Sequence, residues 1–193
     1  MRFNSKKRTL LAAWIIFAEG RAYPQDAIDK LQPLVETSAR RLAIAEQVAL
    51  SKWDSGAAVE DPSRETQVIS SAVRAGESRR LDHTAVSSFF RAQIEANKLV
   101  QYSLLAEWRR AGKAPDHTPV DLASTIRPQL DEVDRALIAE LEQSTAILGS
   151  ASCRVEIAKA VGGYVSAHKN SLGPLKAIAL DRALATACTG PLR

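Results

Sequence analysis

The chain has 193 residues, 46% of them hydrophobic and 25% charged, which is the composition of an ordinary globular domain with one core. Its formal net charge of +4 comes from the first 22 residues, and the remainder carries no net formal charge. Binding to nucleic acid needs a basic surface, so this charge distribution argues against a nucleic-acid partner.

Residues 1–22 have the pattern of a secretory signal peptide. Four basic residues precede an uncharged run, Thr9 to Ala18. This run is shorter than the ~20 apolar residues that span a bilayer. We predict cleavage after Gly20 or Ala22, which would leave residues 23–193 as a periplasmic or secreted domain without membrane attachment. The alternative is an N-terminal helix that is retained and packs on the domain.

The spacing of apolar residues predicts an all-α fold, a single bundle of about six helices, and no alternating run indicates a sheet. The helices are expected at 26–55, 62–76, 82–110, 121–148, from 152 and from 173 to about 188. Asp26, Asp82 and Ser152 are candidate N-caps. The glycine pair 162–163 is expected to interrupt or loosen the fifth helix. The Pro-rich stretch 112–119 divides helices at about 26–110 from a C-terminal helical extension at about 121–190.

Two cations of the first predicted helix lie on one face. Arg41 and Lys52 are eleven residues apart, which is three turns plus about 20°, so their side chains can reach a common point. Asp61 and the proline after it then open a new helix and bring Arg64 and Glu65 onto its first turn. This convergence predicts a binding site for a small anion with several charges. The alternative is a solvated charged face.

A polar stripe recurs every four residues on the third predicted helix, at Gln93, Asn97 and Gln101. Such a stripe on a largely apolar helix is exposed, paired in the core, or turned toward a ligand. The histidines are far apart, and no nucleophile motif or phosphate-binding glycine loop is present. We therefore expect no metal and no cofactor.

The two cysteines, Cys153 and Cys188, lie in the C-terminal third of the chain. In an oxidising compartment such a pair indicates a disulfide, whereas in the cytosol it would be two buried thiols. The signal-like leader favours the disulfide.

Three motifs together resemble one known family: R-x10-K-W from Arg41, V-E-D-x2-R-E from Val59, and F-x2-Q-I-x2-N-x3-Q-Y-x5-W from Phe90. The pattern is similar to the chorismate mutases of the all-helical type, especially their secreted (gamma) subclass. The resemblance implies a type II-like fold, a homodimer, and an isomerase that converts chorismate to prephenate by an intramolecular Claisen rearrangement, a step of aromatic amino acid biosynthesis from the shikimate pathway.

The resemblance also implies roles for individual residues. The implied catalytic residues are Lys52, Gln101 and Glu65. Those implied to bind substrate are Arg41, Arg64, Asn97, Arg127 and Asp61. Lys52 and Gln101 would contact the ether oxygen, and Asn97 stands where the family usually has Ser or Thr. Two alternatives stay open from the sequence: a lyase that releases pyruvate from isochorismate, and a periplasmic protein that binds a small dianion without catalysis.

Overall fold

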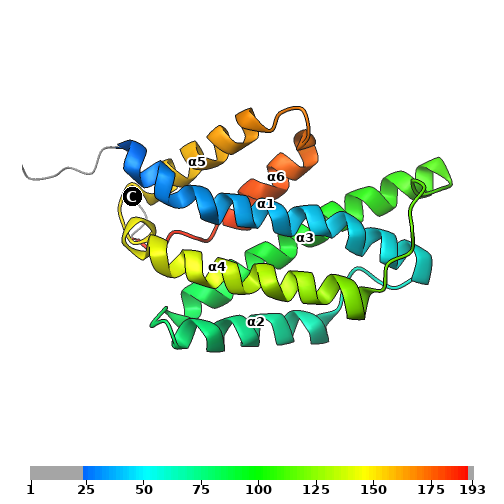
Figure 1. The fold of residues 1–193 in the computed structure, drawn as a ribbon, viewed down its shortest axis with the longest axis horizontal. Helices are drawn as coiled ribbons and strands as arrows, with labels where there is room; N and C mark the ends of the chain where they lie inside the picture. The colour runs from blue at the N-terminus through cyan, green and yellow to red at the C-terminus, as the bar shows by residue number, and fades with distance from the viewer. Residues whose placement is uncertain (1–23, 191–193) are drawn as a thin grey trace, which may run out of the picture.

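The computed structural model describes residues 24–190, which form helices and connecting loops without a strand (Figure 1). The helices are α1 (Pro24–Ser55), α2 (Pro62–Glu77), α3 (His83–Ala111), α4 (Arg127–Leu148), α5 (Cys153–Ala167) and α6 (Gly173–Leu184), with a π-helical turn, η1 (Leu122–Ile126), before α4. The predicted six-helix, all-α fold is confirmed. The predicted signal peptide, residues 1–22, and its cleavage position lie outside the described residues.

The two longest helices, α1 and α3, form the centre of the bundle. The shorter helices cover them from two sides: α2 and α4 pack on one side, and α5 and α6 on the other (Figure 1). The core is built mainly from side chains of these elements, including the edge-to-face pair of Phe89 and Phe90. None of the described helices is long and apolar enough to cross a membrane.

The helix starts agree with the sequence at two of the four expected caps, Asp61 and Asp82. Asp82 accepts a hydrogen bond from the backbone of Ala85 at 2.8 Å, and Asp61 caps α2. The expected cap at Asp26 is wrong: α1 is already helical at Pro24, the first described residue, so Asp26 lies inside its first turn. Ser152 precedes α5 as expected but makes no side-chain capping bond.

The C-terminal half differs from the expectation in three places. Residues 122–126 form a π-helical turn, so α4 begins at Arg127, with Pro128 in its first turn, where the missing N–H has no cost. α5 continues through the glycine pair to Ala167, because neither glycine needs a positive φ. α6 ends at Leu184, four residues before Cys188.

The predicted disulfide is present. Cys153 and Cys188 are bonded, with their Cα atoms 5.8 Å apart. The bond joins the first residue of α5 to the segment that follows α6, so it closes the C-terminal extension onto itself. The alternative of two free thiols is wrong.

Candidate active site

A pocket lies between α1, α2, α3 and the start of α4, and all eight residues expected to bind substrate or act in catalysis line it. Its charged lining consists of five cations and two carboxylates: Arg41, Lys52, Arg64, Lys98, Arg127, Asp61 and Glu65. Two amides, Asn97 and Gln101, and six apolar side chains complete it: Val48, Val59, Val68, Ile94, Leu122 and Leu130. The four residues predicted to converge, Arg41, Lys52, Arg64 and Glu65, therefore do lie around one pocket.

Arg41 enters the pocket from the middle of α1, where its side chain is only 4% exposed. Its Nε donates a 2.8 Å hydrogen bond to Asp134 Oδ1 on α4, and one terminal nitrogen donates to the Gln93 carbonyl at 3.0 Å. A buried guanidinium requires such partners because it keeps its charge at every accessible pH. The remaining N–H groups of the fork are donors for a ligand. The alternative of a solvated charged face is wrong for this residue.

Lys52 lies three turns further along α1 and is also buried, at 8% exposure. Its Nζ donates to the Val59 carbonyl at 2.7 Å, so the ammonium is held against the loop between α1 and α2. Burial lowers the pKa of Lys52, while the carboxylates of Asp61 and Glu65 oppose that shift. An ammonium with one fixed partner retains two donors, and these can face an oxygen in the pocket.

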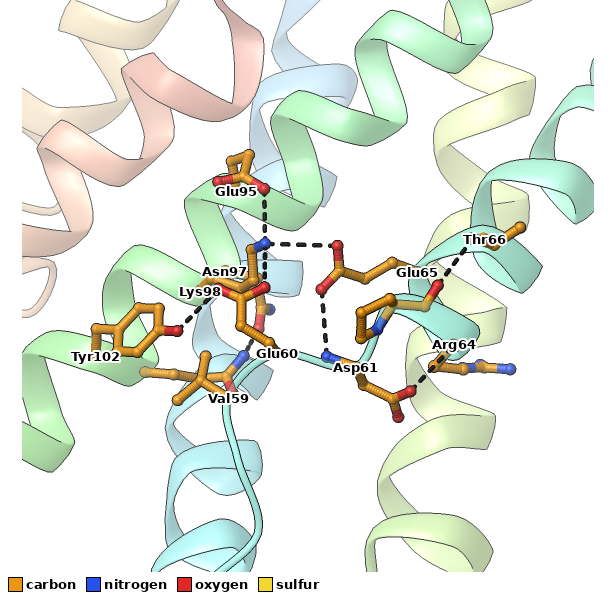
Figure 2. Close-up of polar contacts among 12 residues, drawn as sticks. Val59, Glu60, Asp61, Arg64, Glu65, Thr66, Glu95, Asn97, Lys98 and Tyr102 are labelled. Carbon is orange, nitrogen blue, oxygen red and sulfur yellow. Dashed lines mark hydrogen bonds and ion pairs between the residues drawn. The ribbon is translucent and has the colours of Figure 1, made fainter.

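The first turn of α2 holds its site residues through a reciprocal cap. Asp61 Oδ1 accepts from the backbone N–H of Arg64 at 3.0 Å, and the Asp61 N–H donates to Glu65 Oε1 at 3.4 Å (Figure 2). This arrangement resembles a capping box and satisfies donors that the helix start leaves free. The Arg64 guanidinium pairs with Asp131 of α4 at 2.6 Å. The cap therefore fixes the Glu65 carboxylate at the wall of the pocket.

Arg127 reaches the pocket from the first residue of α4, after the loop that follows α3. Its guanidinium lies 3.6 Å from Asp61 Oδ2. Arg127, expected from the region after the linker, thus lines the same pocket as the residues of α1, α2 and α3.

The polar stripe of α3 is buried, so the alternative of an exposed stripe is wrong. One of its residues is paired in the core, and the other two face the pocket. Gln93 is paired in the core with Ser38 Oγ and the Ala183 carbonyl. Asn97 and Gln101 line the pocket.

The amides of Asn97 and Gln101 have a defined orientation. Asn97 Nδ2 donates to the Arg41 carbonyl at 3.2 Å, which turns its Oδ1 toward Gln101. Gln101 Nε2 donates to that oxygen at 2.6 Å, and Gln101 Oε1 is buried without a hydrogen-bond partner among residues 24–190. The second N–H of Gln101 is a donor for the pocket.

Three residues that the sequence reasoning missed complete the electrostatics of the site. Asp131 and Asp134 of α4 pair with Arg64 and Arg41, and Lys98 lines the pocket between Glu60 and Glu65. Helical spacing was the available signal: the two aspartates follow Arg127 by four and seven residues, and Lys98 precedes Gln101 by three, so each shares a face with a predicted residue.

The lining can hold a small dianion and stabilise an oxygen that gains negative charge. Its cations outnumber its carboxylates by three, guanidinium forks match carboxylates in shape, and the Lys52 and Gln101 donors need no cofactor to act. Among the described residues, no three His, Cys, Asp or Glu side chains are grouped so as to hold a metal ion.

Comparison with known proteins gives one family throughout. Residues 24–102 match the family model of chorismate mutase type II. A secreted chorismate mutase of Mycolicibacterium smegmatis is 31% identical over 163 residues, which is 84% of this chain and 88% of that protein. The chorismate mutase crystal structure from Burkholderia phymatum superposes with a TM-score of 0.79 at 41% identity, covering 84% of this chain and 98% of that one.

A second crystal structure, the chorismate mutase from Burkholderia thailandensis, has a TM-score of 0.77 at 31% identity and covers 82% of this chain and 99% of that one. These matches extend beyond residue 102 into the C-terminal helices. The similarity in sequence and the shared helical fold place this chain in the chorismate mutase family, in its all-helical type.

Proposed function

We infer that this chain is an exported chorismate mutase, an isomerase that converts chorismate to prephenate in the pocket between α1, α2, α3 and α4. The observation that carries this inference is the buried pair of cations on one face of α1, Arg41 and Lys52, in a pocket that also contains the Gln101 amide. Membership of the family supplies the reaction, and the secreted relatives together with the disulfide support a periplasmic or secreted location.

The arginines would bind the two carboxylates of chorismate. Arg41, Arg64 and Arg127 approach the pocket from three different helices, so two planar ligand groups can be held at once in separate directions. Fixing both carboxylates keeps the enolpyruvyl arm over the ring. The reactive conformer then no longer has to be found by free rotation, which removes much of the barrier.

The donors at the centre of the pocket would stabilise the transition state. The ether C–O bond breaks while the new C–C bond forms, and negative charge grows on the ether oxygen. Lys52 and Gln101 would donate hydrogen bonds to this oxygen, and these bonds strengthen as the charge develops. Glu65 would accept from the ring hydroxyl, with Asp61 fixing its position through the helix cap.

Asn97 donates one amide N–H to the Arg41 carbonyl and accepts from Gln101 through Oδ1, and its second N–H would be a donor for the substrate. We propose that it orients the Gln101 amide.

The family resemblance supports a proposal for the domain division and the assembly. We propose that residues 1–22 are a cleaved leader, that helices at about 26–110 carry most of the site, and that the extension at about 121–190 adds Arg127 and the disulfide. We also propose a homodimer without membrane attachment. Light scattering of the purified mature chain tests this, and a monomer at working concentration would contradict it.

Incubating the purified protein with chorismate and following its loss and the formation of prephenate tests the function. We expect turnover, and we expect Lys52→Ala to lower kcat by about 10²–10³-fold, the usual cost of one preorganised donor, with helicity unchanged. Lys169→Ala, an exposed lysine outside the pocket, is the matched control. Release of pyruvate from isochorismate without mutase activity would indicate the lyase instead. Binding of chorismate without any conversion would leave only a binding protein.

A further inference from the structure

Lys98 lies at the centre of a carboxylate cluster beside the pocket. It is on α3, directly after Asn97, and its side chain is 12% exposed. Its Nζ is 2.8 Å from Glu60, 2.8 Å from Glu95 and 3.4 Å from Glu65 (Figure 2). These carboxylates come from the loop before α2, from α3 itself and from α2. Lys98 therefore ties the start of α2 and the preceding loop to α3.

Glu60 is the loop residue of this cluster, and both of its carboxylate oxygens are engaged. Oε2 accepts from Lys98, and Oε1 accepts from the Tyr102 hydroxyl at 2.8 Å (Figure 2). Tyr102 follows Lys98 by four residues, so the two donors project from the same face of α3. The Glu60 side chain is 50% exposed and does not line the pocket, so any effect on the chemistry must pass through its neighbours.

The residues on either side of Glu60 in the chain each supply a backbone group that contacts a residue of the site. The carbonyl of Val59 is the hydrogen-bond acceptor of Lys52 Nζ. The N–H of Asp61 donates to Glu65. In the loop that carries them, residues 56–58 are exposed and Gly56 has a positive φ of 69°. Anchoring Glu60 to α3 therefore also fixes the two backbone groups that contact the Lys52 ammonium and the Glu65 carboxylate.

We propose that Glu60, clamped by Lys98 and Tyr102, is a positioning residue that holds the Lys52 ammonium and the Glu65 carboxylate in their reactive places. This inference rests on the proposed function, because it assigns the placement of two groups that the reaction would use. We call the contacts of Lys98 and Tyr102 with Glu60 the clamp. The geometry favours a positioning role over a role in stability alone, since the clamp acts on an exposed loop and contributes no side chain to the core.

The charges of the clamp persist around neutral pH. Burial opposes the charge on Lys98, but its hydrogen bonds with Glu60 and Glu95 outweigh burial and raise its pKa. Hydrogen bonds from Lys98 and Tyr102 lower the pKa of Glu60. The ion pair is therefore formed across the range in which the enzyme would be assayed.

The test compares Glu60→Ala with Glu142→Ala, a glutamate that is also exposed and also ion-paired, but to Arg79 and outside the pocket. We expect Glu60→Ala to lower kcat on the order of tenfold or more, since small displacements of reacting groups have large effects on rate. KM and the melting temperature should stay close to those of the control. Equal kcat values in the two variants would overturn the proposal.

Tyr102→Phe provides a second arm, because the hydroxyl acts only through Glu60. It should lower kcat by a smaller factor in the wild-type background and have no effect in the Glu60→Ala background. Additive effects would contradict the proposed route. Tyr164→Phe, which removes a hydroxyl remote from the pocket, is the control for this variant.

The pH profile separates positioning from a structural role. Lys52 is surrounded by the pocket charges Arg41, Asp61, Arg64, Glu65, Lys98 and Arg127, and Glu60 adds a negative charge that favours its protonated form. In Glu60→Gln, the alkaline fall of kcat should therefore begin at lower pH than in the wild type. An alkaline fall at the same pH in both proteins would refute the proposed effect of Glu60 on Lys52.

If the wild type has no mutase activity, the proposed function fails. If it is active and Glu60→Ala is equally active, only the clamp fails.

Discussion

The buried ion pair between Arg41 and Asp134 allows a direct test of how the pocket is stabilised. Asp134→Ala removes the carboxylate that accepts from Arg41 Nε, and the guanidinium, 4% exposed, is left among buried groups with the Gln93 carbonyl as its remaining partner. Breaking a buried pair by deleting one partner costs about 3–5 kcal/mol. Because one hydrogen bond remains, we expect the lower end, about 3 kcal/mol.

The same helix provides a matched control. Asp131 pairs with Arg64 at 2.6 Å, but its side chain is 48% exposed, against 14% for Asp134. Exposed pairs contribute at most about 1 kcal/mol, because water replaces the lost partner. Asp131→Ala should therefore cost less than about 1 kcal/mol, although both variants remove an aspartate that contacts an arginine of the pocket.

Thermal and denaturant unfolding of both variants measure the difference. For a domain of this size, 1 kcal/mol shifts the melting temperature by about 2–4 °C, so Asp134→Ala should lower it by roughly 6–12 °C and Asp131→Ala by less than about 4 °C. The reasoning is refuted if the two variants lose the same stability. It is also refuted if Asp134→Ala loses less than its neighbour.

Two further predictions concern pH and redox state. Because burial lowers the pKa of Lys52, its ammonium is lost at a lower pH than that of an ordinary lysine, so kcat should fall on the alkaline side. It should not rise from pH 7 to about 5, because Gln101 donates without taking up a proton; a steep rise would contradict this. Cys188→Ser should lower the free energy of unfolding by about 4 kcal/mol, the chain-entropy estimate for a loop of 35 residues. Its kcat at 25 °C should be unchanged, since no residue of α5 or α6 lines the pocket, and lost activity in a folded variant would count against this.

The sequence by itself determined the helices and eight of the side chains that line the pocket. Local rules suffice for these features: the 3.6-residue period places Arg41 and Lys52 on one face, and the Asp–Pro pair at residues 61 and 62 starts α2 with Glu65 in its first turn. The errors at helix ends are also local, as at residues 122–126, where a π-helical turn precedes α4.

Only the tertiary structure decided how the charges are paired. Whether Arg41 is solvated or buried depends on α4, which brings Asp134 to it from 93 positions away, and no local pattern encodes that contact. The same holds for Gln93, which turned to the core, and for Lys98, which joins three carboxylates of different elements. A sequence specifies which groups are charged, whereas burial and distance fix the strength of their interactions, and those quantities exist only once the helices have packed.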